Sequence, residues 1–239
     1  MVAHLAHNSS IIITPILFIL KHLIMVFKGE LHNVKLINFS VDIEEVQDLI
    51  PKGLEVFQEN GKAIISMVDV QLKKMSPSWM PLLKFGYRHV AFRLLLNDKS
   101  MSGEVEPKGI FFLKSFSEHI PLNWAGNLIG NYNLTFAKIK ECLDAVSLSS
   151  KNKFINYALD PYEQIETNTS LFDKIKRIDR AYAKEKANVY VTQIVRKEWP
   201  IEPIKCYHFA TNFFKTATLL GAFQVKNPIL YKWEEARLI

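Results

Sequence analysis

The stretch "LIPKGLEVFQENGKAIISMV", Leu49 to Val68, decides the fold because it holds a stop, a turn and a long β-prone run in direct succession. Pro51 disfavours helical geometry at the residue before it. The dipeptide Asn60-Gly61 supplies the two positive-φ residues that a type I′ hairpin turn requires. We therefore predict a β-hairpin whose second arm is a long strand over residues 62–72.

Two segments have helical spacing. Over residues 41–50 the apolar side chains of Val41, Val46 and Ile50 can share one helical face, and carboxylates occupy the first turn. Over residues 133–146 the apolar residues again recur at helical intervals. We expect a helix in each segment.

The rest of the chain is mostly β-prone. Further runs of this kind cover residues 31–41, 87–96, 109–116, 154–159, 188–195 and 206–211. Strands do not alternate with helices, and neither GxGxxG nor a P-loop occurs, which argues against a parallel nucleotide-binding sheet. We predict a mainly β, α+β fold: an antiparallel sheet, closed into a barrel or strongly curled, with a few peripheral helices.

Length and composition indicate a globular protein. A chain of 239 residues with 49% hydrophobic and 23% charged residues can bury a large core, and it is too apolar for disorder. The net charge of +6 is spread along the chain, and even the densest basic runs, 174–177 and 184–186, accompany no nucleic-acid motif. We expect no nucleic-acid partner; an anionic small molecule suits the positive charge.

Cysteine and histidine usage gives no sign of a metal or a disulfide framework. Cys142 and Cys206 stand in unlike contexts without zinc-type spacing, and no HExxH pattern occurs. A reducing compartment fits this pattern best, so we expect a cytoplasmic protein without a metal or cofactor.

The apolar run at residues 11–20 is too short to cross a bilayer, which needs about 20 apolar residues. It also lacks the preceding basic residues of a signal peptide. We divide the chain into an N-terminal apolar helix over residues 1–30 and one β domain over residues 31–239. Membrane-surface attachment and a degenerate export signal or anchor are the alternatives for the N-terminal run.

Three stretches resemble the YqjF-like group of the acetoacetate decarboxylase-like superfamily. They are residues 41–68, the pair "YRHVAFRLLL" and "GIFFLKSF" at residues 87–96 and 109–116, and the closing "NPILYKWEEARLI" at residues 227–239. The resemblance runs from about residue 31 to the end of the chain. It implies the barrel-like fold of that superfamily and an interior site for a small anionic or carbonyl-bearing ligand.

The same resemblance bears on chemistry, because the superfamily's decarboxylases use a lysine that forms a Schiff base. In the comparable stretch "AGNLIGNYNL", residues 125–134, Tyr132 and Asn133 stand where those enzymes have proline and lysine. An amide cannot form an imine. The resemblance therefore implies a protein that lacks the Schiff-base lysine, without acetoacetate decarboxylase activity.

Strand alternation within residues 87–96 places Tyr87, His89 and Arg93 on one face. If that face lines the barrel, Arg93 and His89 can hold a carboxylate, with arginine making a bidentate contact. The alternative is that the face is exposed to solvent or that Arg93 pairs with an acid such as Asp69. The candidate ligand-binding residues are Tyr87, Arg93, Asp69, Tyr132 and Asn133.

The sequence does not decide whether the protein is an enzyme. Lys114, flanked by phenylalanines, is a candidate nucleophile or base if it is desolvated, and otherwise an edge-strand lysine reaching water. Three hypotheses follow: a protein that binds a small anionic or carbonyl-containing ligand, a lyase-like enzyme of altered mechanism using Lys114 or His89 with Arg93, and an interaction module. In the third, the N-terminal helix docks a partner or a second subunit, which would make a homo-oligomer.

Overall fold

The computed structural model describes residues 26–97, 107–119, 134–160, 162–163, 169–185, 187–196 and 199–239. The strands are β1 (Phe27–Asp42), β2 (Glu55–Val56), β3 (Gln58–Glu59), β4 (Lys62–Pro77), β5 (Phe85–Asn97), β6 (Pro107–Ser117), β7 (Leu134–Phe136), β8 (Lys138–Cys142), β9 (Ala145–Ser150), β10 (Lys153–Asp160), β11 (Arg180–Glu185), β12 (Asn188–Arg196), β13 (Glu202–Thr211), β14 (Thr218–Val225), β15 (Ile229–Trp233) and β16 (Arg237–Leu238). The helical elements are η1 (Ile43–Glu45), η2 (Gln47–Leu49) and α3 (Thr169–Lys176).

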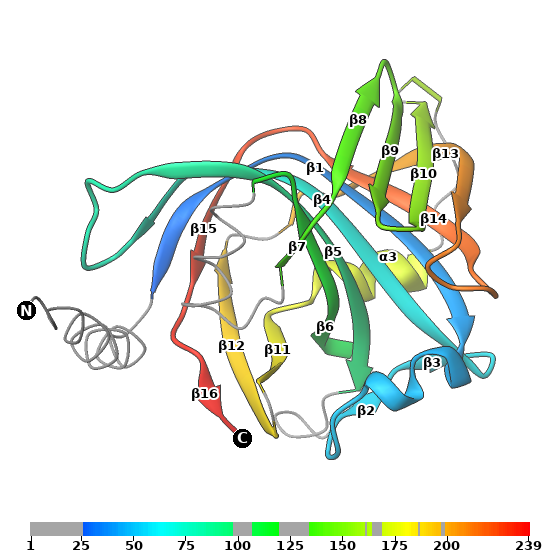
Figure 1. Ribbon diagram of the computed structural model, residues 1–239, viewed down its shortest axis with the longest axis horizontal. Helices are drawn as coiled ribbons and strands as arrows, with labels where there is room; N and C mark the ends of the chain where they lie inside the picture. The colour runs from blue at the N-terminus through cyan, green and yellow to red at the C-terminus, as the bar shows by residue number, and fades with distance from the viewer. Residues whose placement is uncertain are drawn as a thin grey trace, which may run out of the picture.

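Seven of these strands form a closed ring. The hydrogen-bonded order runs β4-β5-β6-β11-β12-β15-β1, and β1 pairs again with β4 (Figure 1). The pairings of β6 with β11 and with β7 are parallel, so the sheet is mixed, although most of its pairs are antiparallel. The predicted mainly β, curled fold with few short helices is confirmed.

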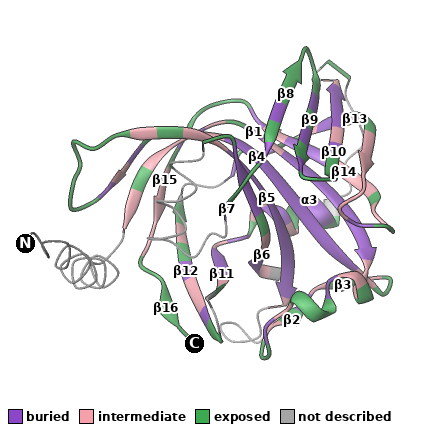
Figure 2. Ribbon diagram, viewed as in Figure 1, coloured by how far each residue is buried: buried purple, intermediate pink, exposed green. Residues whose placement is uncertain are grey.

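A second layer covers part of the outside of the ring. From β1 the sheet continues through β14, β13, β10, β9 and β8, and the last three stand together at the upper right of Figure 1. One apolar core lies between this layer and the outer face of the ring, and a second fills the ring interior against α3. Figure 2 shows the buried strands where the two layers meet.

The sequence after the turn is continuously apolar because strand β4, which it forms, is buried on both faces. It is buried from Ala63 to Val70 because one face contacts the ring interior and the other contacts the second layer. The predicted turn is confirmed: Asn60 and Gly61 adopt φ values of 52° and 77°, and β3 pairs with β4 across them.

The helix predicted over residues 133–146 is wrong, because this segment forms β7, β8 and the start of β9. Cys142 pairs with Ala145, and Leu143 takes a positive φ of 52° in the turn between them. Ile139 and Val146 are buried against the ring. Contacts with distant strands thus override the helical spacing of the apolar residues.

Near the N-terminus, two boundaries also differ from the prediction. The helix expected over residues 41–50 is divided into η1 and η2. Its Glu45 carboxylate accepts hydrogen bonds from the backbone N–H groups of Lys215 and Thr216 at 2.6 and 2.7 Å, which ties this segment to a distant loop. Strand β1 begins at Phe27, within the range assigned to the N-terminal helix, and the rest of that range lies outside the described residues.

The sequence reading missed helix α3. Its Leu171 and Ile175 are buried in the interior core. Within the described residues, no helix is both long and apolar enough to span a bilayer.

Candidate functional site

Strand β5 directs a polar row of side chains into the ring. Tyr87, His89 and Arg93 share one face with the interior core, as strand alternation predicts. That this face is the inside follows from contacts across the ring. Phe112 of β6 lies 6.0 Å from Trp233 of β15, centroid to centroid, although β11 and β12 separate their strands in the sheet.

Arg93 is the central charged group of this interior. Its side chain is 6% exposed, and the guanidinium donates from Nε to the Ser66 carbonyl at 3.0 Å and from Nη2 to the Ser66 hydroxyl at 2.9 Å. Its carbon Cζ lies 6.0 Å from the ring centroid of Trp199, a cation–π distance. Among the described residues, no carboxylate pairs with Arg93.

Burial without a counter-charge shapes the electrostatics of this interior. It lowers the pKa of Arg93 to about 10, so the guanidinium still carries its charge at neutral pH, and Tyr231 lies within electrostatic range of it. Burial, and secondly the charge of Arg93, lower the pKa of His89 to about 4. The imidazole is therefore neutral at physiological pH. Burial also raises the pKa of Tyr87 to about 12, which keeps its phenol protonated.

Aromatic rings form a connected wall beside these polar groups. Centroid distances are 5.9 Å from Tyr87 to His89, 6.5 Å from His89 to Phe112, and 5.9 Å from Tyr231 to Trp233. With the contact between Phe112 and Trp233, the wall extends from β5 through β6 to β15. A cation, a neutral imidazole and phenols set in an apolar wall suit a small planar anion that sheds its water, because the wall offers few groups to replace a full hydration shell.

Asp69 does not belong to this interior. It lies on the opposite face of β4, where Arg88 donates to its two carboxylate oxygens at 2.8 and 2.7 Å and the Tyr157 hydroxyl donates to it as well. Arg88 also donates to Glu141 of β8 at 2.7 Å. The alternative in which Asp69 pairs with Arg93 is therefore wrong, and the Asp69 carboxylate, already engaged between the two layers, does not belong to the candidate site.

The other predicted residues separate from the interior group. Lys114 is exposed on β6, so it lacks the burial on which its proposed role as nucleophile or base depends. Tyr132 and Asn133 lie outside the described residues. Nowhere in the described ranges do three or more His, Cys, Asp or Glu residues gather in a way that would hold a metal ion.

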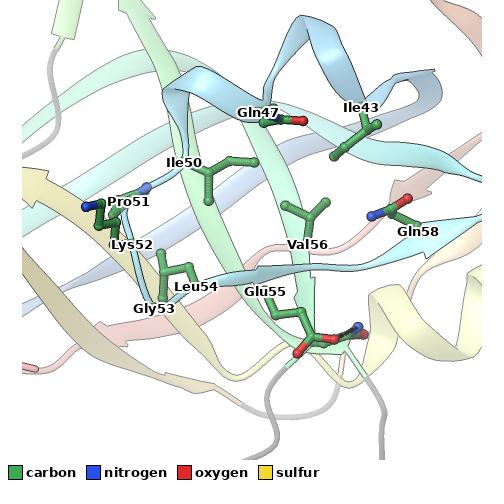
Figure 3. Close-up of a pocket in the computed structure, with 11 residues that line it drawn as sticks. Ile43, Gln47, Ile50, Pro51, Lys52, Gly53, Leu54, Glu55, Val56 and Gln58 are labelled. Carbon is green, nitrogen blue, oxygen red and sulfur yellow. Dashed lines mark hydrogen bonds between the residues drawn. The ribbon is translucent and has the colours of Figure 1, made fainter.

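Two surface hollows lie apart from Arg93 and His89. One, of about 590 Å³, is bordered by η1, η2 and β2, where Ile43, Ile50 and Val56 point toward one another between Gln47 and Gln58 (Figure 3). The other, of about 620 Å³, lies along β1, β4 and β15 and includes Tyr231. Neither is lined by Arg93 or His89.

Three interior residues were missed in the sequence: Ser66, Trp199 and Tyr231. The serine has no catalytic motif around it, and its role depends on the register that sets it opposite Arg93. Trp199 and Tyr231 reach the site from segments more than one hundred residues further along the chain. Local sequence carries no signal for such contacts.

Comparison with known families accounts for most of the chain. The family DUF2071, described as "Uncharacterized conserved protein (COG2071)", matches residues 28–232. The chain belongs to the DUF2071 family. No curated protein matches this DUF2071 chain.

Solved structures relate this DUF2071 protein to acetoacetate decarboxylase-like folds. It is similar to acetoacetate decarboxylase from Legionella pneumophila, with a TM-score of 0.56, 10% identity, and coverage of 89% of this chain and 86% of the other. It is also similar to an acetoacetate decarboxylase-like enzyme from Sphingomonas wittichii, with a TM-score of 0.53, 10% identity, and coverage of 90% of this chain and 92% of the other. The enduracididine biosynthesis enzyme MppR complexed with pyruvate has a TM-score of 0.53 and 13% identity, with coverage of 90% of each chain. At these identities the likeness establishes the fold.

Proposed function

We propose that this DUF2071 protein binds a small carboxylate-bearing molecule inside the ring, with Arg93 as the partner of the carboxylate. The observation that carries the proposal is a buried guanidinium whose hydrogen bonds go to Ser66 alone and which faces no carboxylate among the described residues. An uncompensated buried charge costs several kcal/mol. A bound anion would offset that cost.

The donors of Arg93 suit this role. A guanidinium carries five N–H donors, and the hydrogen bonds to Ser66 come from Nε and Nη2. Nη1 therefore has donors to offer a ligand, and the contacts to Ser66 hold the group in a fixed orientation. Charge-assisted bonds between arginine and a carboxylate are about twice as strong as neutral ones.

The surrounding groups indicate what the rest of the ligand would be. Neutral His89 and the protonated phenol of Tyr87 can hydrogen-bond a carbonyl or hydroxyl, and the aromatic wall through Phe112 can pack against a planar apolar body. We infer a 2-oxo or 3-oxo acid or an aromatic acid. The pyruvate complex of MppR, a protein of similar fold, supports this class of ligand.

The same proposal holds that binding proceeds without a Schiff base, in a chain of the YqjF-like type. Its support is the sequence pairing that sets Asn133 at the position of the lysine, together with the exposure of Lys114. Borohydride treatment in the presence of pyruvate or acetoacetate should therefore leave the intact mass unchanged. A single adduct on one lysine would show that the ligand forms an imine with the protein, and would contradict binding without a Schiff base.

Binding is tested by thermal shift and calorimetry with pyruvate, acetoacetate, phenylpyruvate and benzoate, and with benzamide as the neutral analogue. The acids should raise the melting temperature, since a ligand of the folded state stabilises it, and the amide should not. Arg93→Met should abolish the shift. Arg88→Lys is the matched control, because Arg88 lies on the opposite face of the same strand. Equal binding by Arg93→Met, or by benzamide, would contradict the proposal.

A second measurement uses the free protein. If Arg93 is kept for binding, Arg93→Met should raise the free energy of unfolding without ligand, by on the order of 1 kcal/mol, since it removes an uncompensated buried charge. Urea denaturation measures this change. Destabilisation by several kcal/mol would instead assign Arg93 a structural role.

A further inference from the structure

The turn between β4 and β5 presents large apolar side chains to solvent. Trp79 is 43% exposed, Met80 38%, Leu82 94% and Leu83 53%. Figure 1 shows this turn projecting beyond the end of the ring, and Figure 2 shows that it is exposed. Four such residues within five positions, 79 to 83, are more than the scattered exposed apolar residues of an ordinary surface.

The turn holds these side chains outward. Met80 N–H donates to the Pro77 carbonyl at 3.0 Å, and Leu83 N–H donates to the Met80 carbonyl at 3.1 Å, so the backbone makes two successive turns. Ser78 N–H donates to the carbonyl of Val26 at 2.8 Å, which fastens the base of the turn to the chain just before β1. These backbone hydrogen bonds therefore hold the apolar tip in a defined conformation.

Lysines rim a hollow next to this turn. The hollow of about 620 Å³ is lined by Lys28, Lys74, Lys84 and Lys232 but by a single acid, Glu30, and its apolar members include Val195 and Leu230. Lys74 pairs with Glu30 at 2.7 Å, and Lys232 pairs with Glu234. Lys28 and Lys84 pair with no carboxylate among the described residues.

The positions of two of these lysines are unfavourable for stability. Lys28 of β1 and Lys232 of β15 lie directly opposite each other in the antiparallel ladder. Like charges in this arrangement destabilise a sheet. An anionic partner in the hollow would relieve the repulsion.

Glu30 and Glu234 already pair with Lys74 and Lys232, and the neighbouring sequence supplies no further carboxylate. Residues 70–97, which include the turn, contain no Asp or Glu, and neither do residues 1–29. The described structure begins at Val26, whose carbonyl accepts the hydrogen bond from Ser78 at the base of the turn.

We propose that this end of the ring docks on an anionic lipid bilayer. The tip formed by residues 79–83 enters the boundary between headgroups and acyl chains, and the lysines of the hollow contact lipid phosphates. Tryptophan and leucine next to lysine are the residue types that lie in this boundary. Each lysine near an anionic surface strengthens attachment by about five-fold.

Vesicle flotation tests the docking surface, with the full-length protein and vesicles of phosphatidylcholine, with or without a third of phosphatidylglycerol. The protein should float with the anionic vesicles only, and less so at high salt because the charges are screened. Leu82→Ser with Leu83→Ser should weaken binding on the order of ten-fold. Lys28→Gln with Lys84→Gln should weaken it about five-fold for each lysine.

The matched control is Leu143→Ser, in the turn between β8 and β9 where Leu143 is 92% exposed, combined with Lys140→Gln on β8. It should bind as the unchanged protein does. Anionic vesicles should also shift the fluorescence of Trp79 to shorter wavelength, and Trp79→Phe should remove that shift.

Three results would overturn the proposal. One is equal binding to neutral and anionic vesicles. Another is loss of binding by the full-length variant Leu17→Ser with Phe18→Ser while both docking-surface variants bind normally, because the N-terminal run alone would then be the anchor. The last is a dimer in solution that Leu82→Ser with Leu83→Ser converts to a monomer, without vesicle binding by either protein, because the tip would then be a subunit interface.

Discussion

Arg88 and Arg93 stand on the same strand, yet their surroundings give them different roles. Arg88 forms a bidentate pair with Asp69 between the two layers. Arg93 points into the ring, and among the described residues Ser66 is its only hydrogen-bonding partner. An odd number of positions separates them, so strand alternation sends them to opposite faces. The first is satisfied by the protein itself, and the second is the group for which we propose an anionic ligand.

The lowered pKa of His89 predicts that the folded protein loses stability in acid. Its folded-state pKa of about 4 lies below the ordinary value of 6.5, so the unfolded chain takes up the proton at higher pH than the folded chain does. The contribution of His89 to stability is complete above 6.5 and is lost as the pH falls toward about 4. The loss should amount to about 3 kcal/mol in urea denaturation at a series of pH values.

The control for this prediction is His89→Gln, which keeps a polar side chain without a titrating ring. The curve of unfolding free energy against pH should be flatter for His89→Gln over the same range. Parallel curves for the two proteins would show that other groups cause the acid sensitivity. A bound carboxylate should also raise the pKa of His89, since it opposes the charge of Arg93.

At the scale of elements, local signals decide turns better than they decide the choice between helix and strand. Asn60-Gly61 was sufficient to predict the hairpin because both residues must take positive φ, a property of the residues themselves. The apolar spacing over residues 133–146 fits a helix equally well, but it is used by paired strands. Which alternative wins depends on burial against the ring, which no local window contains.

The hairpin turn can be tested directly. Gly61 has a φ of 77°, and no atom lies within 4 Å of where a Cβ would stand. Gly61→Ala should therefore lower the free energy of unfolding by about 1 kcal/mol through backbone conformation alone. Lys62→Ala, the next residue along, is the comparison, and chemical denaturation measures both. Equal effects would mean that the positive φ of Gly61 contributes nothing.

At the scale of the whole molecule, a polar network that is buried at Tyr157 and Asp69 and exposed at Glu141 joins the two layers. Tyr157 of β10 donates to Asp69 of β4, and Glu141 of β8 accepts from Arg88 of β5 and from Lys35 of β1 at 2.7 Å each. Burial, the carboxylate of Asp69 and the hydrogen bond to it raise the pKa of Tyr157 well above its usual range, so the phenol stays a donor. The outer layer is thereby fixed in register on the ring.

Removing one hydroxyl tests this connection. Tyr157 is 2% exposed, and Tyr157→Phe should cost about 2 kcal/mol of unfolding free energy, since it removes a hydrogen bond to a buried carboxylate. Tyr207→Phe, at a side chain that is 59% exposed, should change stability by less than about 0.5 kcal/mol. If the two substitutions cost the same, the network does not hold the layers together.

The sequence by itself determined the hairpin at Asn60-Gly61, the curled β fold, and the shared face of Tyr87, His89 and Arg93. The hairpin and the shared face depend on backbone preferences or on alternation within one strand, which act over a few residues, and the mainly β fold depends on the β-prone runs along the whole chain. Only the tertiary structure decided that Asp69 pairs with Arg88, that residues 134–150 are strands, and that Trp199 and Tyr231 lie beside Arg93. Those outcomes depend on strand register and ring closure, which bring together residues far apart in the chain to bury them.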